Sequence, residues 1–366
     1  MTDSNNRPYR VIQWATGYVG ALCLGEIIRN PRLELAGVLV YGDKAGKDAG
    51  TLVGVDEVGL TATRDREAMI ATDADCVIYA PLAASIEQLD DDIVALLESG
   101  KNVITTAGYF APKCRGEDVV ARLEAACAKG HSSLLGTGIE PGFMLDRVGP
   151  MLTGVCSDID YILLQEIADC AHHPAAQMMK EAIGFGKAPD DVRSDPVFGP
   201  YWKTFFTESV TSVAVGLGLE LDDVEVGLEV VTTPHELDIA IGRIAAGTVS
   251  GVKYTVNGMV DGAAFIRCEH LWSVAKTGDD WPAGWPKPDD RYRYTFQIEG
   301  RPSIRATIDP VPSLSPGGTD YDAALLGTAA TAINAIPEVC AAAPGILHPT
   351  IYAPWRKTLP AVAVNA

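Results

Sequence analysis

Three small residues near the N-terminus have the spacing of a dinucleotide-binding turn. Ala15, Gly17 and Gly20 follow a short apolar run and precede a helix-like pattern, as A-x-G-x-x-G. Such a turn needs a tight bend, close approach of the backbone to a pyrophosphate, and close packing of helix on strand. Phosphates would lie on the amides that begin the helix, where the helix dipole favours an anion. The alternative is a glycine turn without a ligand.

The stretch after the second apolar run indicates which dinucleotide is bound. Asp or Glu at that strand end would hold the ribose hydroxyls of NAD. Here the chain reads Tyr41-Gly42-Asp43-Lys44, so the only acid of this stretch, Asp43, lies slightly beyond the strand end. Lys44 and Lys47 can accept the 2′-phosphate of NADP, or are solvated loop charges. We therefore expect NADP(H) to be favoured over NAD(H). The expected cofactor-binding residues are Ala15, Thr16, Gly17, Tyr18, Val19, Gly20, Asp43, Lys44, Ala80, Thr106 and Gly138.

A second glycine-rich segment, GTGIEPGF at residues 136–143, follows the last strand pattern of the N-terminal half. A loop in this place can approach the nicotinamide, because ligands bind at the carboxyl ends of parallel strands. Gly138 is its expected contact. The alternative is a turn that only crosses between domains.

Hydride transfer needs an oriented substrate and a proton donor. Tyr109 directly follows a strand pattern, and His173, with His172 beside it, follows a long strand pattern. Glu140 lies in the glycine-rich segment. We expect the donor among Tyr109, His173 and Glu140, with water held by Glu140 or Glu166 as the alternative. Each of these side chains also has a plain packing or surface role open to it.

The elements that position these residues alternate between strand and helix up to residue 136. Strand patterns cover Arg10–Ala15, Leu33–Tyr41, Cys76–Ala80, Asn102–Thr106 and Ser132–Leu135. Helix patterns cover Val19–Asn30, Ser85–Ser99 and Gly116–Lys129. Strands separated by such helices indicate βαβ units and a parallel sheet. The fold expected for residues 1–150 is therefore a Rossmann-type, doubly wound α/β domain.

The pattern changes after residue 150. Arg291–Ile298 alternates strictly, which predicts a half-buried strand of an antiparallel sheet. Further strand patterns cover Asp158–Ile167, Val224–Thr232, Leu237–Ala246, Gly251–Val256 and Phe265–Trp272, and Pro196–Gly218 predicts a long helix. Residues 151–315 are expected to form an α+β domain on a mostly antiparallel sheet. Residues 316–366, with the Ala-rich run Tyr321–Ile336, are expected to return to the first domain.

Composition limits the function classes. The net charge of −19 opposes nucleic-acid binding. No apolar run approaches the roughly 18 residues of a membrane span. The N-terminal segment is polar, so we expect a cytoplasmic protein. None of the eight cysteines forms a C-x-x-C pair, and no metal site is expected. The Pro- and Gly-rich segment Thr277–Asp290 is the best candidate for a loop or lid. A lid with Trp272, Trp281 and Trp285 around it would suit an uncharged, fairly hydrophobic substrate, whereas the alternative is that two of these tryptophans only anchor a long loop by packing.

Three runs together resemble a known family. VIQWATGYVG, LELAGVLVYGDKAGKDAG and GTGIEPGF are similar to the dihydrodipicolinate reductase-like NAD(P)-dependent oxidoreductases, nearest the branch of 2,4-diaminopentanoate dehydrogenase and the native amine dehydrogenases. The resemblance covers residues 8–150 well and the rest in outline. It implies a Rossmann domain with an α+β domain, reduction of C=N or C=O bonds with NADH or NADPH, and a homodimer.

Two departures from the family limit what the resemblance implies. Dihydrodipicolinate reductases carry His-His-x-x-Lys, whereas Ala176 follows His172-His173 at the lysine position. Amine dehydrogenases of the branch carry a Glu after the strand equivalent to Asn102–Thr106, and the segment here has no acid. We expect an oxidoreductase for a small, fairly hydrophobic carbonyl, imine or amine. The alternatives are a non-catalytic NAD(P) sensor, an isomerase-like enzyme of the same fold, or an amine dehydrogenase-like enzyme with a different acid.

Overall fold

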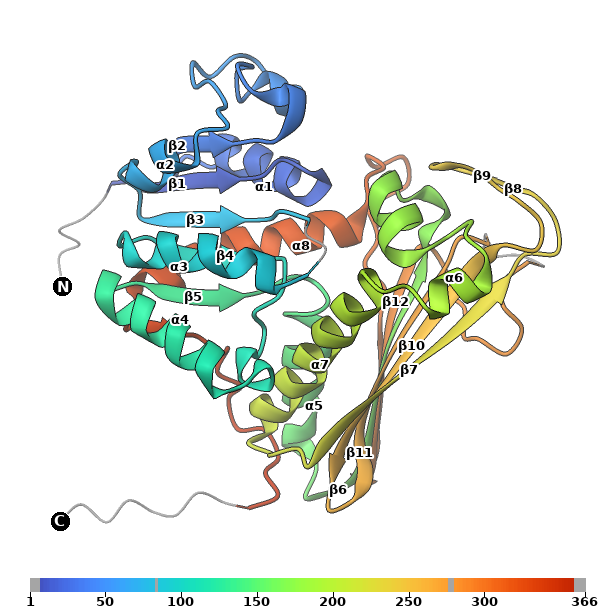
Figure 1. The fold of residues 1–366 in the computed structure, drawn as a ribbon. Coiled ribbons are helices and arrows are strands. Elements are labelled where there is room, and N and C mark those ends of the chain that lie inside the picture. Colours follow the sequence, from blue (N-terminus) through green and yellow to red (C-terminus); the bar gives the residue numbers. More distant parts are fainter. Residues whose placement is uncertain (1–6, 83–84, 276–279, 359–366) are drawn as a thin grey trace, which may run out of the picture.

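The computed structural model describes residues 7–82, 85–275 and 280–358, and it contains two six-stranded sheets (Figure 1). The first sheet is parallel throughout, in the order β14-β5-β4-β3-β1-β2. Its strands are β1 (Tyr9–Trp14), β2 (Leu33–Leu39), β3 (Cys76–Tyr79), β4 (Asn102–Thr105), β5 (Ser133–Gly136) and β14 (Gly345–Ile346). The expected doubly wound sheet is confirmed. Strand β14 was not expected, because two residues are too few to show a strand pattern in the sequence.

Helices cover both faces of this sheet, which is why its strands are apolar runs without alternation. One face packs on α3 (Asp90–Glu98) and α4 (Glu117–Gly130). The other packs on α1 (Tyr18–Arg29), α8 (Ala323–Asn334) and α9 (Ile336–Ala341). The small side chains of α8 let it lie against α1. Among the described residues, the helical stretch Ala323–Ala341 is apolar and long enough to cross a membrane, by length and composition only. In this fold it packs on the sheet.

The second sheet is mixed and has the order β13-β12-β6-β11-β10-β7. Its strands are β6 (Asp158–Asp169), β7 (Asp223–Thr232), β10 (Val249–Val260), β11 (Ala263–Ser273), β12 (Tyr292–Arg301) and β13 (Ile304–Ile308). Only the β6–β11 pair is parallel. The alternation of β12 is confirmed, because Tyr292, Tyr294, Phe296 and Ile298 are all buried. The long helix α7 (Phe198–Leu217) lies along one face of this sheet (Figure 1).

Two expectations for the second sheet differ from the structure. The segment Leu237–Ala246 is a separate hairpin of β8 (Leu237–Ile239) and β9 (Gly242–Ile244), because Gly242 turns the chain at a φ of 100°. Trp281 and Trp285 pack with Ile167 and Leu271, which point to the face of the sheet opposite α7. These two tryptophans therefore cover the outer face of the sheet. Part of the expected lid, residues 276–279, lies outside the described residues.

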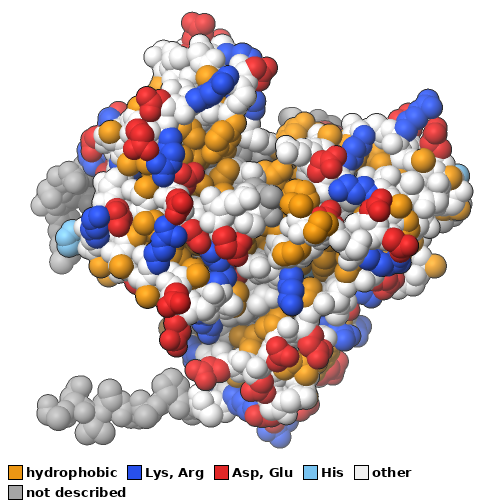
Figure 2. All heavy atoms as spheres, in the orientation of Figure 1, with side chains coloured by type: hydrophobic (Ala, Val, Ile, Leu, Met, Phe, Trp, Pro, Cys, Tyr) orange, Lys and Arg blue, Asp and Glu red, His pale blue; other side chains and the backbone are white. Residues whose placement is uncertain are grey.

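Short helical segments join the strands and the longer helices. Two of them are π-helical turns, η5 (Met144–Val148) and η8 (Gln177–Ile183), a form that is rare and often found at functional sites. The remaining helices are α2 (Arg66–Ala71), α5 (Gly149–Leu152) and α6 (Pro189–Arg193), with 3₁₀ turns at Gly42–Lys44, Thr51–Val53, Glu87–Leu89, Pro112–Arg115, Thr153–Val155 and Cys170–His172. Figure 2 shows acidic and basic side chains interspersed over one face of the molecule, around a hollow between its two halves.

Candidate active site

The turn between β1 and α1 has the geometry expected of a phosphate site. Ala15 adopts a φ of 70°, which makes the tight bend. A Cβ atom at Gly17 would meet no heavy atom within 4 Å, whereas one at Gly20 would lie 2.2 Å from the carbonyl oxygen of Ala15. Gly17 thus leaves the backbone open to a ligand, and Gly20 is required for helix-strand packing. The residues present fit a bound pyrophosphate.

A side chain from β1 and one from the 3₁₀ turn Gly42–Lys44 fix this turn. The Nε2 of buried Gln13 donates to the carbonyl oxygen of Ala15 at 2.8 Å. The ammonium of Lys44 donates to the carbonyl oxygen of Thr16, so Lys44 lies beside the expected phosphates. Asp43 and Lys47 are exposed on the segment after β2.

A cleft of about 320 Å³ opens beside the turn, and we call it the cofactor cleft. It brings together five expected cofactor contacts: Gly17, Tyr18, Val19, Ala80 and Thr106. The opposite wall comes from the second half of the chain, through His173, Gln177, Met178, Tyr201 and Leu325. The carboxyl ends of β1, β3 and β4 therefore face residues that follow β6.

A smaller cavity of about 180 Å³, the inner cavity, adjoins the cofactor cleft and shares His173, Met178 and Leu325 with it. Its lining is mostly apolar and aromatic: Ile139, Ala168, Cys170, Met179, Ile183, Trp202, Phe205, Trp272, Tyr292 and Ala324. Two carboxylates, Glu140 and Glu166, also line it. Pocket walls of this kind bind small organic molecules through a few placed polar groups.

Glu166 is held by three donors from neighbouring strands. One oxygen accepts from His270 Nδ1 at 3.2 Å and from Trp272 Nε1 at 2.8 Å, and the other accepts from the Tyr294 hydroxyl at 3.2 Å. The register explains this, because Glu166 on β6 pairs with His270 on β11 and with Tyr294 on β12. The carboxylate is therefore fixed in orientation at the end of the inner cavity.

Glu140 has a different environment. Its oxygens accept from the Leu145 amide at 3.0 Å and from the Ser209 hydroxyl at 3.2 Å. Burial, together with the charges of Asp146 and Glu166, raises the pKa of Glu140 well above its ordinary value. Two carboxyl groups whose settings differ in this way can divide acid-base and electrostatic roles.

His173 lines both cavities, at their junction. Its Nδ1 accepts from the amide of Ala175 at 3.2 Å, so the neutral ring carries its proton on Nε2. Burial lowers the pKa of His173, and the nearby charge of Asp322 opposes that shift. Asp322 also accepts from the hydroxyl of Tyr292 at 2.7 Å. Tyr292 was expected only in the core, since the alternation of its strand marks a buried face and cannot show a cavity.

Three expected residues lie elsewhere. Tyr109 is fully buried, and its hydroxyl donates to Asp90 at 2.6 Å beneath the guanidinium of Arg115. This geometry argues against Tyr109 as the proton donor. Gly138 is buried and does not line the cofactor cleft. A Cβ there would lie 2.7 Å from the carbonyl oxygen of Pro141, so the backbone of Gly138 packs within its own loop. Its loop instead delivers Glu140 to the inner cavity. His172 is exposed.

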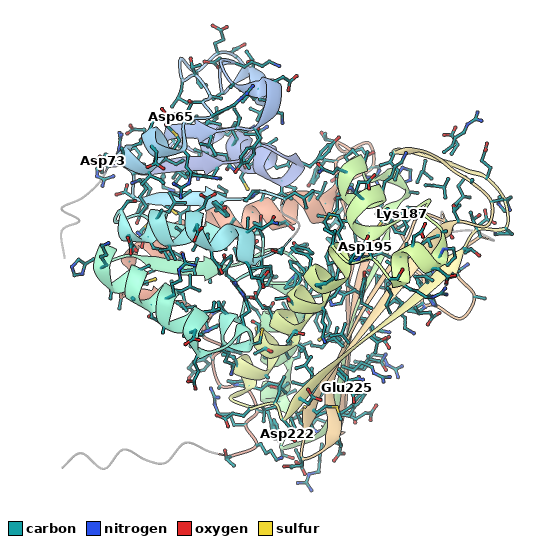
Figure 3. The ribbon with its side chains drawn as sticks, in the orientation of Figure 1. Asp65, Asp73, Lys187, Asp195, Asp222 and Glu225 are labelled. Carbon is teal, nitrogen blue, oxygen red and sulfur yellow. The ribbon has the colours of Figure 1, made fainter. Side chains whose placement is uncertain are left out.

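Helix α7 was not expected to contribute, yet it carries Tyr201, Trp202 and Phe205 to the cavities. Its start is anchored by Asp195, which accepts from the amides of Val197 and Phe198 and lies 3.6 Å from Lys187. Figure 3 shows Lys187 and Asp195 close together beside this end of the helix, and Asp222 and Glu225 at the far end of β7. No group of His, Cys, Asp and Glu among the described residues could hold a metal ion.

Glu208 on α7 is a further buried carboxylate outside both cavities. It is fully enclosed and accepts from the Phe110 amide at 2.9 Å, so it ties α7 to the segment that follows β4. Burial raises its pKa to about 7, against the opposing effects of Arg115 and of the backbone amides of residues 109–111.

Comparisons with known proteins agree with this arrangement. The profile of the 2,4-diaminopentanoate dehydrogenase C-terminal domain matches residues 143–352. An amine dehydrogenase from Streptomyces virginiae is 29% identical over 361 residues, which cover 95% of this chain and 97% of that protein. The 2,4-diaminopentanoate dehydrogenase of Acetoanaerobium sticklandii is 26% identical and covers 96% of this chain and 94% of its own.

A solved structure shows the same fold. The amine dehydrogenase from Mycobacterium smegmatis superposes with a TM-score of 0.73 at 19% identity, over 94% of this chain and 96% of that one.

We expect Gly17→Val and Gly20→Val to fail in different ways. Gly17→Val should fold normally, since its side chain enters open space, and should weaken NADP(H) binding at least about tenfold, or ~1.4 kcal/mol. Gly20→Val should lower the unfolding temperature through its clash with Ala15. Calorimetric titration and thermal unfolding measure the two effects. Unchanged cofactor affinity in folded Gly17→Val would show that the phosphates bind elsewhere.

We expect Glu208→Gln to change how stability depends on pH. The folded protein holds the Glu208 proton more tightly than the unfolded chain, so its ionisation costs stability as pH rises from the ordinary value of 4.5 to about 7. The glutamine keeps an acceptor for Phe110 and removes that cost, which is about 3 kcal/mol. In urea unfolding from about pH 5 to about pH 8, the free energy of unfolding of the variant should rise relative to that of the natural protein. If the stability of Glu208→Gln followed the same pH dependence as the natural protein, as expected for the exposed control Glu220→Gln, the prediction would be contradicted.

Proposed function

This chain belongs to the family defined by the 2,4-diaminopentanoate dehydrogenase C-terminal domain and is an NAD(P)-dependent oxidoreductase, and we propose that it interconverts a small amine and the corresponding carbonyl compound through an imine. The observation that carries the proposal is the pair Glu140 and Glu166 in a cavity whose lining is otherwise mostly apolar and which adjoins the cofactor cleft. The two named relatives, an amine dehydrogenase and a diaminopentanoate dehydrogenase, support it.

A cationic substrate nitrogen suits this cavity for electrostatic reasons. Charge enclosed among aromatic side chains is costly unless it is paired. The three donors to Glu166 fix the orientation of its carboxyl group, which can pair with an ammonium or iminium group. An uncharged alcohol would gain less from the same site.

The substrate we propose has no carboxylate. Among the described residues, none of those that line the inner cavity is Lys or Arg, so a substrate carboxylate would find no partner there. That composition favours an amine with a small apolar group over an amino acid such as the substrate named for the diaminopentanoate relative.

The residues have distinct roles in amine oxidation. Glu140 takes a proton from the substrate ammonium, because a raised pKa brings a carboxylate closer to the basicity that this transfer needs. The bound NAD(P)⁺ supplies the hydride acceptor, and the hydride leaves the carbon that bears the nitrogen. The product at this carbon is an iminium ion, whose charge Glu166 stabilises. Water adds to the iminium carbon, and His173 donates from Nε2 to the oxygen of the carbinolamine that forms. Both protons of that water end on the nitrogen, which leaves as ammonium, and the carbonyl product remains.

The cofactor proposal follows the same geometry. The Gly17 turn would hold the pyrophosphate, and Ala80 and Thr106 in the cofactor cleft would contact the nicotinamide ring. NADP(H) is preferred, because Lys44 lies beside the turn and Lys47 is exposed nearby, with no acid on the last residue of β2.

A homodimer is also part of the proposal. The face of the second sheet opposite α7 carries half-exposed side chains from its central strands, such as Tyr161, Leu163, Arg267 and Thr295. A sheet face of this kind, mixed in polarity and covered only in part by Trp281 and Trp285 among the described residues, suits a second copy. Light scattering across a range of protein concentrations tests the assembly.

We expect removal of both lysines, Lys44→Ala with Lys47→Ala, to weaken NADPH at least about tenfold more than NADH, since only NADPH carries the 2′-phosphate. Lys47→Ala alone is the control that leaves the contact to Thr16 intact. Titration by protein fluorescence measures both cofactors. Equal losses for the two would contradict the preference.

We expect Glu140→Gln to lower the rate of amine oxidation by about 10² to 10⁴, the usual contribution of a general base. In the natural protein, kcat/KM should rise with pH through the raised pKa of Glu140, because only the ionised carboxylate takes the proton. The variant should lose that rise and keep its affinity for the cofactor. Formation of NAD(P)H from a primary amine, measured across pH, provides the data. If kcat/KM of Glu140→Gln still rose with pH as in the natural protein, the group that takes the proton would be another one.

A further inference from the structure

A third cavity lies behind the inner cavity, and we call it the side cavity. It measures about 380 Å³ and lies between α7, the segment around α6 and the edge strand β7. Much of its lining is apolar, through Ala182, Ile183, Val192, Phe198, Pro200, Trp202, Val226, Leu228 and Tyr254. Its polar members are Arg193, Ser194, Asp195 and Lys203.

Two side chains belong to both the inner and the side cavity. Trp202 comes from α7 and Ile183 from η8, and they are 4% and 3% exposed. The indole of Trp202 is fixed, because its Nε1 donates to the carbonyl oxygen of Ala182 at 2.7 Å. Its ring also stacks on Phe206 and meets Trp272 edge-on, with ring centroids 5.5 and 5.4 Å apart. Trp202 and Ile183 thus form a rigid partition between the two cavities.

The partition limits the size of what the inner cavity can hold. A buried apolar cavity of roughly 150 Å³ is known to hold one benzene molecule. The inner cavity, at about 180 Å³, therefore suits an apolar group of about six carbons. Beyond the partition, the side cavity offers about twice that space, with apolar walls.

We propose that Trp202 and Ile183 determine substrate length, and that opening this partition admits long linear alkylamines whose chains extend into the side cavity. The proposal rests on the proposed amine dehydrogenase function and goes beyond it, because it assigns specificity to two residues that touch neither the cofactor cleft nor the carboxylates' hydrogen bonds. The nitrogen stays at Glu140 and Glu166, and only the far end of the chain crosses the former partition.

The test compares Trp202→Leu and Ile183→Ala with the natural protein on linear primary amines from butylamine to decylamine. Oxidation is followed by NAD(P)H formation, and binding of the same amines to the NADP⁺ complex is followed by calorimetry. In both variants, kcat/KM and affinity should rise with chain length beyond hexylamine, by about fourfold for each methylene that enters the side cavity. In the natural protein both should fall beyond that length.

Phe198→Leu is the matched control, because Phe198 lines the side cavity and not the inner one. It enlarges the side cavity behind an intact partition, so its chain-length profile should match that of the natural protein. Trp202 belongs to an aromatic cluster, and Ile183→Ala opens the same partition with a smaller loss of packing if Trp202→Leu does not fold.

The outcomes separate the two proposals. If no amine is oxidised but the variants still gain affinity for long amines, the partition is supported and the proposed function fails. If the natural protein oxidises short amines and Ile183→Ala shows an unchanged chain-length profile, or Phe198→Leu shifts it as much, the inference is overturned.

Discussion

A carboxylate among aromatic side chains is the constraint on which the site depends. Glu166 is stable there because the register of three strands aims His270, Trp272 and Tyr294 at its two oxygens. The sheet therefore positions a fixed negative charge beside the inner cavity. Hydrophobic walls strengthen its attraction for a cation, since there is little water to screen it. Glu140 faces the same space with its pKa raised above the ordinary value, and in the proposed function one carboxyl group pairs with the cation while the other moves a proton.

Helix α7 links the carboxyl groups of the inner cavity to the cofactor cleft. It bears Trp202 and Phe205 on the inner cavity, and its Ser209 hydroxyl donates to Glu140. Its Glu208 binds the backbone after β4, the strand end from which Thr106 reaches the cofactor cleft. One helix thus links Glu140 in the inner cavity to the strand end that borders the cofactor cleft, and the proposed hydride transfer requires the spacing between the two to be short and constant.

The sequence predicted features that depend on local order. The glycine turn after β1, the parallel sheet and the buried face of β12 follow from spacing and periodicity within short windows. The partners of Glu166 did not, because they stand 104 to 128 residues away and meet it only through strand register. Tyr109 was expected at the cleft from its place after β4, but the chain turns at Gly108 and Tyr109, with φ of 114° and 66°, and the ring points to Asp90. Trp281 and Trp285 lie within the segment expected as a loop or lid, and in the structure they pack on the sheet face opposite α7.

The central claim is that the inner cavity binds a cation through Glu166, and calorimetry tests it most directly. Isobutylamine and its neutral isostere isobutanol are titrated into the NADP⁺ complexes of the natural protein and of Glu166→Gln. The account predicts that the natural protein binds the amine at least about tenfold more tightly than the alcohol, and that the variant loses this difference while its NADP⁺ affinity is unchanged. Equal affinity for amine and alcohol in the natural protein, or a preference for the amine that survives in Glu166→Gln, would contradict it.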